Sequence, residues 1–141
     1  MTASFYLEGI DQTAEEVAAG AGSHRLKVTG IATTDKDGAP LVTKKGAPYL
    51  RIKLAFEDID ASPFSAFVGL PFDGQDAKDR ARDLRRIKRI KKVFGEDPNA
   101  PEWNPEDYVG RVVEVAVSAK PSKRDDAVDG QLDNDVLWPK F

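Results

Sequence analysis

Residues 48–56 read PYLRIKLAF, and this stretch shows the clearest alternation of apolar and polar side chains in the chain. Side chains at every second position of a β-strand lie on the same face of the sheet. One face therefore carries Leu50, Ile52, Leu54 and Phe56, and the other carries Tyr49, Arg51, Lys53 and Ala55. The stretch predicts a half-buried strand with a core face and an outer face that is aromatic and basic.

Other segments alternate in the same way. Leu26 and Val28 alternate with polar residues from His24 onward, until Gly30 permits a bulge or bend. Residues 64–70 alternate so that Phe67 lies on the opposite face from its apolar neighbours, and residues 111–119 predict a fourth strand. Residues 128–141 could supply a fifth strand, and the turn-rich residues 33–47 predict a long loop or a loose hairpin.

Between the third and fourth strands the period becomes helical. An apolar stripe at spacings of three and four residues consists of Ala77, Ala81, Leu84, Ile87 and Phe94, with Ile90 beside them. Asp73 can cap the start of this helix, with Asp76 three residues later, and Gly95 followed by Pro98 marks its end. Asn104-Pro105 predicts a single further helical turn.

This order of elements lacks a βαβ repeat, so it argues against a doubly wound parallel sheet. It fits an all-β fold with one inserted α-helix: a five-stranded OB-fold-like barrel whose helix lies between strands 3 and 4. A chain of 141 residues makes one domain. We expect an N-terminal arm at residues 1–23, the OB-fold domain at 24–137 and a C-terminal tip at 138–141.

Composition narrows the function classes. The chain has no cysteine, which excludes disulfides, thiol nucleophiles and cysteine zinc sites, and its single histidine argues against a Ser-His or conventional metal site. It has neither an apolar run of about 18 residues nor a secretory signal pattern. We therefore expect a cytoplasmic protein without a membrane contact, a metal or a cofactor.

The net charge of −3 hides a strong segregation of charge. Residues 1–75 sum to −3, residues 76–95 to +6 and residues 96–141 to −6. The natural partner of the basic block is either a polyanion or the acidic segment of the same chain. Both alternatives stay open at this point.

Four segments carry a resemblance to a known family. They are GSHRLKV (22–28), KGAPYLRIKL (45–54), VGRVVEV (109–115) and DGQLDNDV (129–136). With them, most of residues 22–137 resembles the small OB-fold single-stranded DNA-binding proteins of tailed bacteriophages. The resemblance implies sequence-independent binding and protection of single-stranded DNA in phage replication or recombination, in the cytoplasm of the host cell.

The same resemblance bears on partners. Such proteins often end in an acidic tail with a terminal aromatic residue that recruits replication or recombination proteins. Here Phe141 ends the chain, but Pro139-Lys140 precede it and a long acidic run is missing. Recruitment of such partners through the C-terminus therefore stays open. An exposed edge strand could also pair two copies into a homo-oligomer.

Coating single-stranded DNA requires cations that follow the phosphates and flat side chains on which bases stack. Tyr49, Arg51 and Lys53 supply both on one strand face. The remaining candidates are Arg25 and Lys27 on the neighbouring strand, Lys44 and Lys45 in the loop, Phe67 and Trp103 for stacking, and Arg86 and Arg89 on the basic helix. Each has a structural alternative: the strand face and helix can be merely solvated, and Phe67 and Trp103 can belong to the core.

Enzyme signatures are weak. There is no phosphate-binding loop, and Asp125–Gly130 fails as a calcium loop because Ala127 occupies a ligand position. Asp129, Asp133 and Asp135 could hold metals in a nuclease, yet a basic or histidine partner is missing nearby. We expect no enzymatic activity. The rival interpretation is an OB-like adaptor that binds another protein through the basic helix or the C-terminal segment and lacks nucleic-acid affinity.

Overall fold

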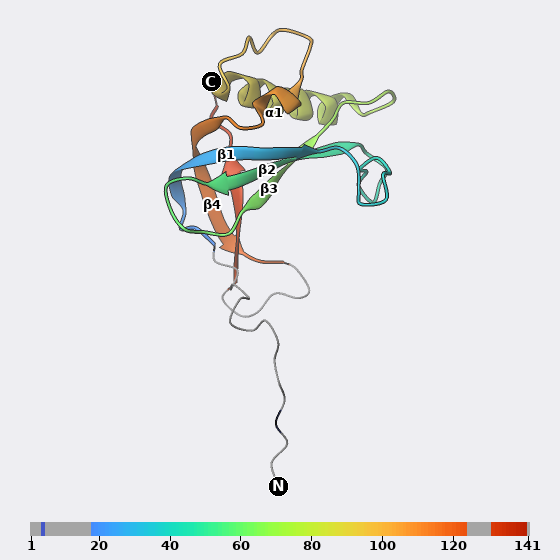
Figure 1. Ribbon diagram of the computed structural model, residues 1–141. Helices are drawn as coiled ribbons and strands as arrows, with labels where there is room; N and C mark the ends of the chain where they lie inside the picture. The colour runs from blue at the N-terminus through green and yellow to red at the C-terminus, as the bar shows by residue number, and fades with distance from the viewer. Residues whose placement is uncertain (1–3, 5–17, 124–130, 141) are drawn as a thin grey trace.

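The computed structural model describes residues 4, 18–123 and 131–140, and it shows an antiparallel barrel with a helix across one end (Figure 1). The elements are β1 (Gly22–Ala32), β2 (Tyr49–Phe56), β3 (Phe64–Gly69), α1 (Ala77–Val93), the 3-10 turn η2 (Pro105–Tyr108), β4 (Val112–Pro121) and β5 (Leu132–Leu137). The strand order is β3-β2-β1-β4-β5, and β3 also approaches β5, so the barrel is nearly closed. The predicted OB-like fold is confirmed, including the helix between strands 3 and 4.

The first strand belongs to both halves of the barrel. Its residues 22–27 pair with β4, and its residues 26–32 pair with β2. The register with β2 shifts between Val28 and Gly30, at the position where the sequence predicted a bulge. A bulge bends a strand and increases its twist, which lets β1 turn from one half of the barrel to the other.

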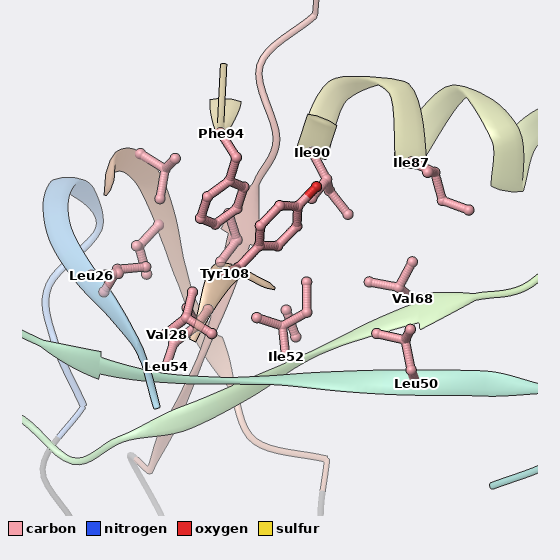
Figure 2. Close-up of a cluster of buried hydrophobic side chains, with 14 residues drawn as sticks. Leu26, Val28, Leu50, Ile52, Leu54, Val68, Ile87, Ile90, Phe94 and Tyr108 are labelled. Carbon is pink, nitrogen blue, oxygen red and sulfur yellow. The ribbon is translucent and has the colours of Figure 1, made fainter. Parts of the chain in front are cut away.

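The inward side chains fill the barrel. Figure 2 shows side chains from β1, β2 and β3 meeting Ile87, Ile90 and Phe94 above them, with Tyr108 between helix and sheet. The predicted core face of β2 is confirmed, because Leu50, Ile52 and Leu54 are buried while Phe56 is half-buried. The apolar side chains of the helix thus close one end of the barrel.

The helix differs from its prediction at two places. The N-cap is Asp76, whose carboxylate accepts a hydrogen bond from the Lys78 backbone N–H at 3.2 Å, so the prediction of Asp73 as the cap was wrong. Leu84 is 41% exposed, and Ala77 is exposed as well, although the stripe placed both on the core face. The helix packs on the barrel through Ile87, Ile90 and Phe94, whereas its first turn, residues 77–80, is exposed. The predicted end is confirmed by Gly95, whose φ of +78° suits glycine.

Two polar side chains of α1, Asp83 and Lys91, are buried. Asp83 lies against Gly69 of β3 and accepts a hydrogen bond from the Gln75 amide at 2.8 Å. The Lys91 ammonium donates to the carbonyl oxygens of Ala100 (2.5 Å) and Glu102 (2.9 Å). These bonds compensate the burial of both groups and fasten α1 to the connections before and after it, while the contact of Asp83 with Gly69 seats the helix on β3.

An aromatic stack anchors the end of the helix. The rings of Phe94 and Tyr108 are parallel with centroids 3.9 Å apart. The Tyr108 hydroxyl donates to Glu96 and accepts from the Trp103 indole N–H at 2.9 Å, and burial raises the pKa of Tyr108. Tyr108 ends the single turn that Asn104-Pro105 predicted.

The loop 33–48 contains two tight turns, around residues 35–38 and 43–46, which matches the expected loop or loose hairpin. Most of the expected arm (residues 1–23) lies outside the described residues. Of its described part, Ala19 is buried, and its backbone exchanges two hydrogen bonds with the Asn134 side chain, at 2.9 and 3.0 Å. In the described part of the chain, no helix is long and apolar enough to cross a membrane.

His24, near the start of β1, forms a charged pair with Asp58. The two ring nitrogens of His24 lie 3.0 Å from the Asp58 carboxylate and 2.7 Å from the Gly20 carbonyl oxygen. Both partners are acceptors, so only the protonated ring satisfies both. The Gly20 carbonyl and Asp58 together raise the pKa of His24 against the opposing effect of desolvation, and His24 keeps the pKa of Asp58 low although desolvation alone would raise it.

This pair predicts a defined pH dependence for Asp58→Asn. The destabilisation should be largest between the ordinary pKa values of 3.8 and 6.5, where both groups are charged in the folded state. It should shrink at lower pH as Asp58 takes a proton, and at higher pH as His24 loses one. Thermal unfolding across pH measures it, with Asp60→Asn as the control of equal charge. A difference that does not vary with pH would contradict the pairing.

Gly69 gives a prediction for the seat of the helix. A Cβ at this position would lie 2.8 Å from an Asp83 carboxylate oxygen, and Asp83 cannot retreat without losing Gln75. We expect Gly69→Ala to lower the free energy of unfolding by about 1–3 kcal/mol, measured by urea denaturation. Gly30→Ala is the matched control, because its Cβ would meet only Lys53 Cδ at 3.6 Å. Equal stability of the two variants would refute the close contact.

Candidate nucleic-acid interface

The outer face of β2 and β3 presents an aromatic pair. Across the two strands Tyr49 lies opposite Gly69, and Arg51 lies opposite Phe67. Phe67 is 57% exposed, as its place in the alternation predicted, and its ring centroid is 5.6 Å from that of Tyr49. Gly69 has no side chain to cover Tyr49, which is half-buried, whereas the Phe67 ring is exposed on the outside of the barrel.

Arg51 lies against both rings. Its guanidinium carbon is 5.2 Å from the Phe67 centroid and 6.0 Å from the Tyr49 centroid. Cation–π contacts of this kind stabilise by about 0.5–1 kcal/mol at exposed sites. Its Nε is buried and has no hydrogen-bond partner in the described part of the chain. We call Tyr49, Arg51 and Phe67 the stacking cluster, since it offers flat surfaces and a cation together.

The stacking cluster lies in a groove. On one side of Phe67, a hollow of about 1150 Å³ is bounded by loop 33–48, by β2 and β3, and by the N-terminal half of α1. On the other side, a hollow of about 560 Å³ lies between Arg51 and the β5 residues Leu132–Asp135. Phe67 lines both hollows and lies between them, and we call the two hollows together the groove. Figure 1 shows loop 33–48 and the start of α1 on the same side of the barrel.

The two ends of the groove differ in charge. The larger hollow is lined by four cations, Lys44, Lys45, Arg82 and Arg86, and by three carboxylates, Asp76, Asp79 and Asp83. Two of these carboxylates lie close to Arg82, at 3.4 Å for Asp79 and 3.6 Å for Asp83. The smaller hollow is lined by Asp133 and Asp135 beside Arg51. Phosphate groups are therefore attracted to the loop and helix end and repelled by the β5 end.

The structure brings together six of the eleven predicted site residues. Lys44, Lys45, Tyr49, Arg51, Phe67 and Arg86 line the groove. Lys53 is exposed and continues the outer face of β2 beside Gly30 of β1. Arg25 and Lys27 are exposed farther along β1, where Arg25 lies opposite Glu114 of β4. Arg89 is half-buried on α1, one turn beyond Arg86.

Trp103 lies elsewhere. It is half-buried against the core, its indole N–H is bonded to Tyr108, and it faces a separate hollow beside Glu106 and Asp107. These contacts match the structural alternative for Trp103, because a large ring next to Tyr108 completes the seal of the barrel end. It is not part of the groove.

The sequence analysis missed the β5 wall of the groove and Arg82. Leu132–Asp135 reach the groove because β5 closes the barrel beside β3, which is a contact between strands far apart in the sequence. No local pattern signals it. Arg82 belonged to the basic helix, but only the seating of Asp83 shows that this side of the helix faces the groove.

Within the described residues, the arginines of α1 form no ion pair with the acidic C-terminal segment. Arg82 pairs with Asp79 and Asp83, both within α1. Within the described residues, Arg85, Arg86 and Arg89 form no ion pair with an acidic side chain. In the described part of the chain, these three arginines therefore remain available to a polyanion.

Metal chemistry gains no support from side-chain placement. Among residues 4, 18–123 and 131–140, no three His, Asp or Glu side chains gather closely enough to hold an ion. Asp129, the first residue of the nuclease alternative, lies outside the described residues.

The comparisons with protein-family models and with curated proteins found no match for this chain.

Proposed function

We propose that the protein binds single-stranded DNA without sequence preference and protects it, as a non-enzymatic component of phage replication or recombination. The observation that carries the proposal is the stacking cluster, with its exposed Phe67 ring, in a groove whose rim holds Lys44 and Lys45. The phage setting rests on the resemblance of residues 22–137, and the host cytoplasm follows from it.

The chemistry of the groove suits a strand whose bases are unpaired. A base can stack on the Phe67 ring or on the Tyr49 ring, and each stacked base contributes about 1–3 kcal/mol. Every base has a flat face, so this contact does not depend on sequence. A duplex hides its bases between neighbouring pairs and cannot use the cluster.

The cations complement the stacking. Lys44, Lys45, Arg51 and Arg86 lie around the rings and can neutralise phosphates on either side of a stacked base. Exposed Phe67 costs hydrophobic free energy in the unbound protein, and a stacked base removes this exposed surface from water. An OB-fold barrel commonly binds oligonucleotides across its strand 2 and 3 face, where these residues lie.

Binding should depend steeply on salt. Five cations line the groove, and one of them, Arg82, already has carboxylate partners. The other four predict that the logarithm of the binding constant falls with the logarithm of salt concentration with a slope of about −3, since each neutralised phosphate contributes about 0.7. Fluorescence anisotropy of a labelled oligonucleotide measures it at several salt concentrations. A label on the DNA is preferable to protein fluorescence, because Trp103 faces away from the groove.

The control for this titration is a duplex of the same length used as competitor. Single strands should displace the labelled oligonucleotide at concentrations at which duplex does not. Absence of binding to single strands at low salt would overturn the proposal and favour the adaptor, which binds protein only.

The stacking cluster makes a second prediction. We expect Phe67→Ala and Tyr49→Ala each to weaken binding by about 5- to 150-fold, the equivalent of about 1–3 kcal/mol for one lost stacking surface. Both side chains lie on the outer face, so the fold should survive, and circular dichroism checks it. The measurement is the same anisotropy titration.

A matched control removes exposed apolar surface elsewhere. Val112 of β4 is 49% exposed and lies outside both hollows of the groove. Val112→Ala should leave binding unchanged. Equal affinities for Phe67→Ala, Tyr49→Ala and Val112→Ala would show that the DNA lies on a different surface.

A further inference from the structure

We propose that the bound strand leaves the groove along one flank of α1, so that the protein's footprint extends from the stacking cluster to Arg85 and Arg89. The inference rests on the proposed function and adds the path of the strand to it. It assigns a role to a charged surface outside the groove.

A row of arginines leads out of the groove. Arg82 and Arg86 both line the larger hollow and are one helical turn apart. Arg89 follows three residues after Arg86, so it continues the same flank. Arg85 lies one turn before Arg89 and is exposed. From Arg82 to Arg89 the row advances about 10 Å along the helix axis at about 1.5 Å per residue.

The charges in this row are unbalanced. Arg82 has carboxylate partners, but Arg85, Arg86 and Arg89 have none within the described residues. Like charges one turn apart on a helix repel each other and destabilise the helix. Phosphates lying along the row would remove this repulsion, so the helix gains from the ligand that the groove requires.

The opposite flank of α1 serves a different purpose. Lys88 donates to the Asn99 side chain at 3.2 Å, and buried Lys91 donates to the carbonyl oxygens of Ala100 and Glu102. The lysines on this flank therefore hold the connection that follows the helix. Within the described residues, Arg85, Arg86 and Arg89 make no such contact, and their flank continues directly from the groove.

The alternative exits are less favourable for a polyanion. The β5 end of the groove presents Asp133 and Asp135. The route over β1 passes Lys53 and reaches Lys27 and Arg25, where Arg25 lies opposite Glu114. Among the described residues on the three routes, only the helix flank beyond Arg82 carries a row of cations without a carboxylate between them.

The test compares a short and a long oligonucleotide. An oligonucleotide of about 4 nucleotides fills the groove only, and one of about 16 nucleotides can reach the helix. Arg85→Glu combined with Arg89→Glu should leave the short one bound as in the wild type. At about 0.1 M salt it should weaken binding of the long one at least about 20-fold, and should lower the magnitude of its salt slope by about 1.4.

Arg25→Glu combined with Lys27→Glu is the matched control, because it changes the net charge equally on the β1 route. This control should change the affinity for the short and the long oligonucleotide by the same factor. A length-dependent loss in this control but not in the helix variant would overturn the proposal and place the exit over β1. Equal loss for both lengths in the helix variant would overturn it too.

Two further readouts keep the outcomes distinct. Circular dichroism reports whether the helix variant is folded, and Arg85→Gln with Arg89→Gln should show the same length dependence with a smaller loss. If the wild type binds neither oligonucleotide, the proposed function fails. If it binds both and the helix variants match it at both lengths, only the path along α1 is wrong.

Discussion

The two-residue alternation of β2 is the constraint on which both the core and the groove depend. Ile52 is fully buried, so its neighbours Arg51 and Lys53 must point outward. A shift of one residue would place the Arg51 guanidinium in the apolar barrel and expose Leu50, Ile52 and Leu54 to water. Pairing with β1 on one side and β3 on the other excludes this shift, so packing of the core also orients the stacking cluster.

Local periodicity made the strands and the outward direction of Phe67 predictable from the sequence. A strand's alternation states which residues share a face, and for β2 and β4 the apolar face is the buried one. The same reasoning failed for Leu84, because a helical stripe does not tell how far along its length the helix is supported. Only the Asp83 contact with Gly69 shows where that support ends.

The parts of the groove that could not be predicted come from distant segments. The β5 wall exists because the barrel closes beside β3, and this contact leaves no trace in a short stretch of sequence. Trp103 lies outside the groove, because its indole N–H donates to Tyr108 at the end of the barrel. The resemblance of residues 22–137 to phage single-stranded DNA-binding proteins supplied an expectation of function, whereas the placement of Lys44, Lys45 and Arg86 around the rings required the folded chain.

The groups that fasten the helix also aim its arginines. Asp83 faces β3 and Lys91 faces the following connection, so the rotation of α1 about its axis is held from two sides. With that rotation, Arg82 and Arg86 face the groove rather than bulk solvent. The stacking cluster contains a phenol, a guanidinium and a phenyl ring. This composition suits the proposed binding by stacking and charge, and the contacts of Asp83 and Lys91 hold the cations of α1 beside the rings.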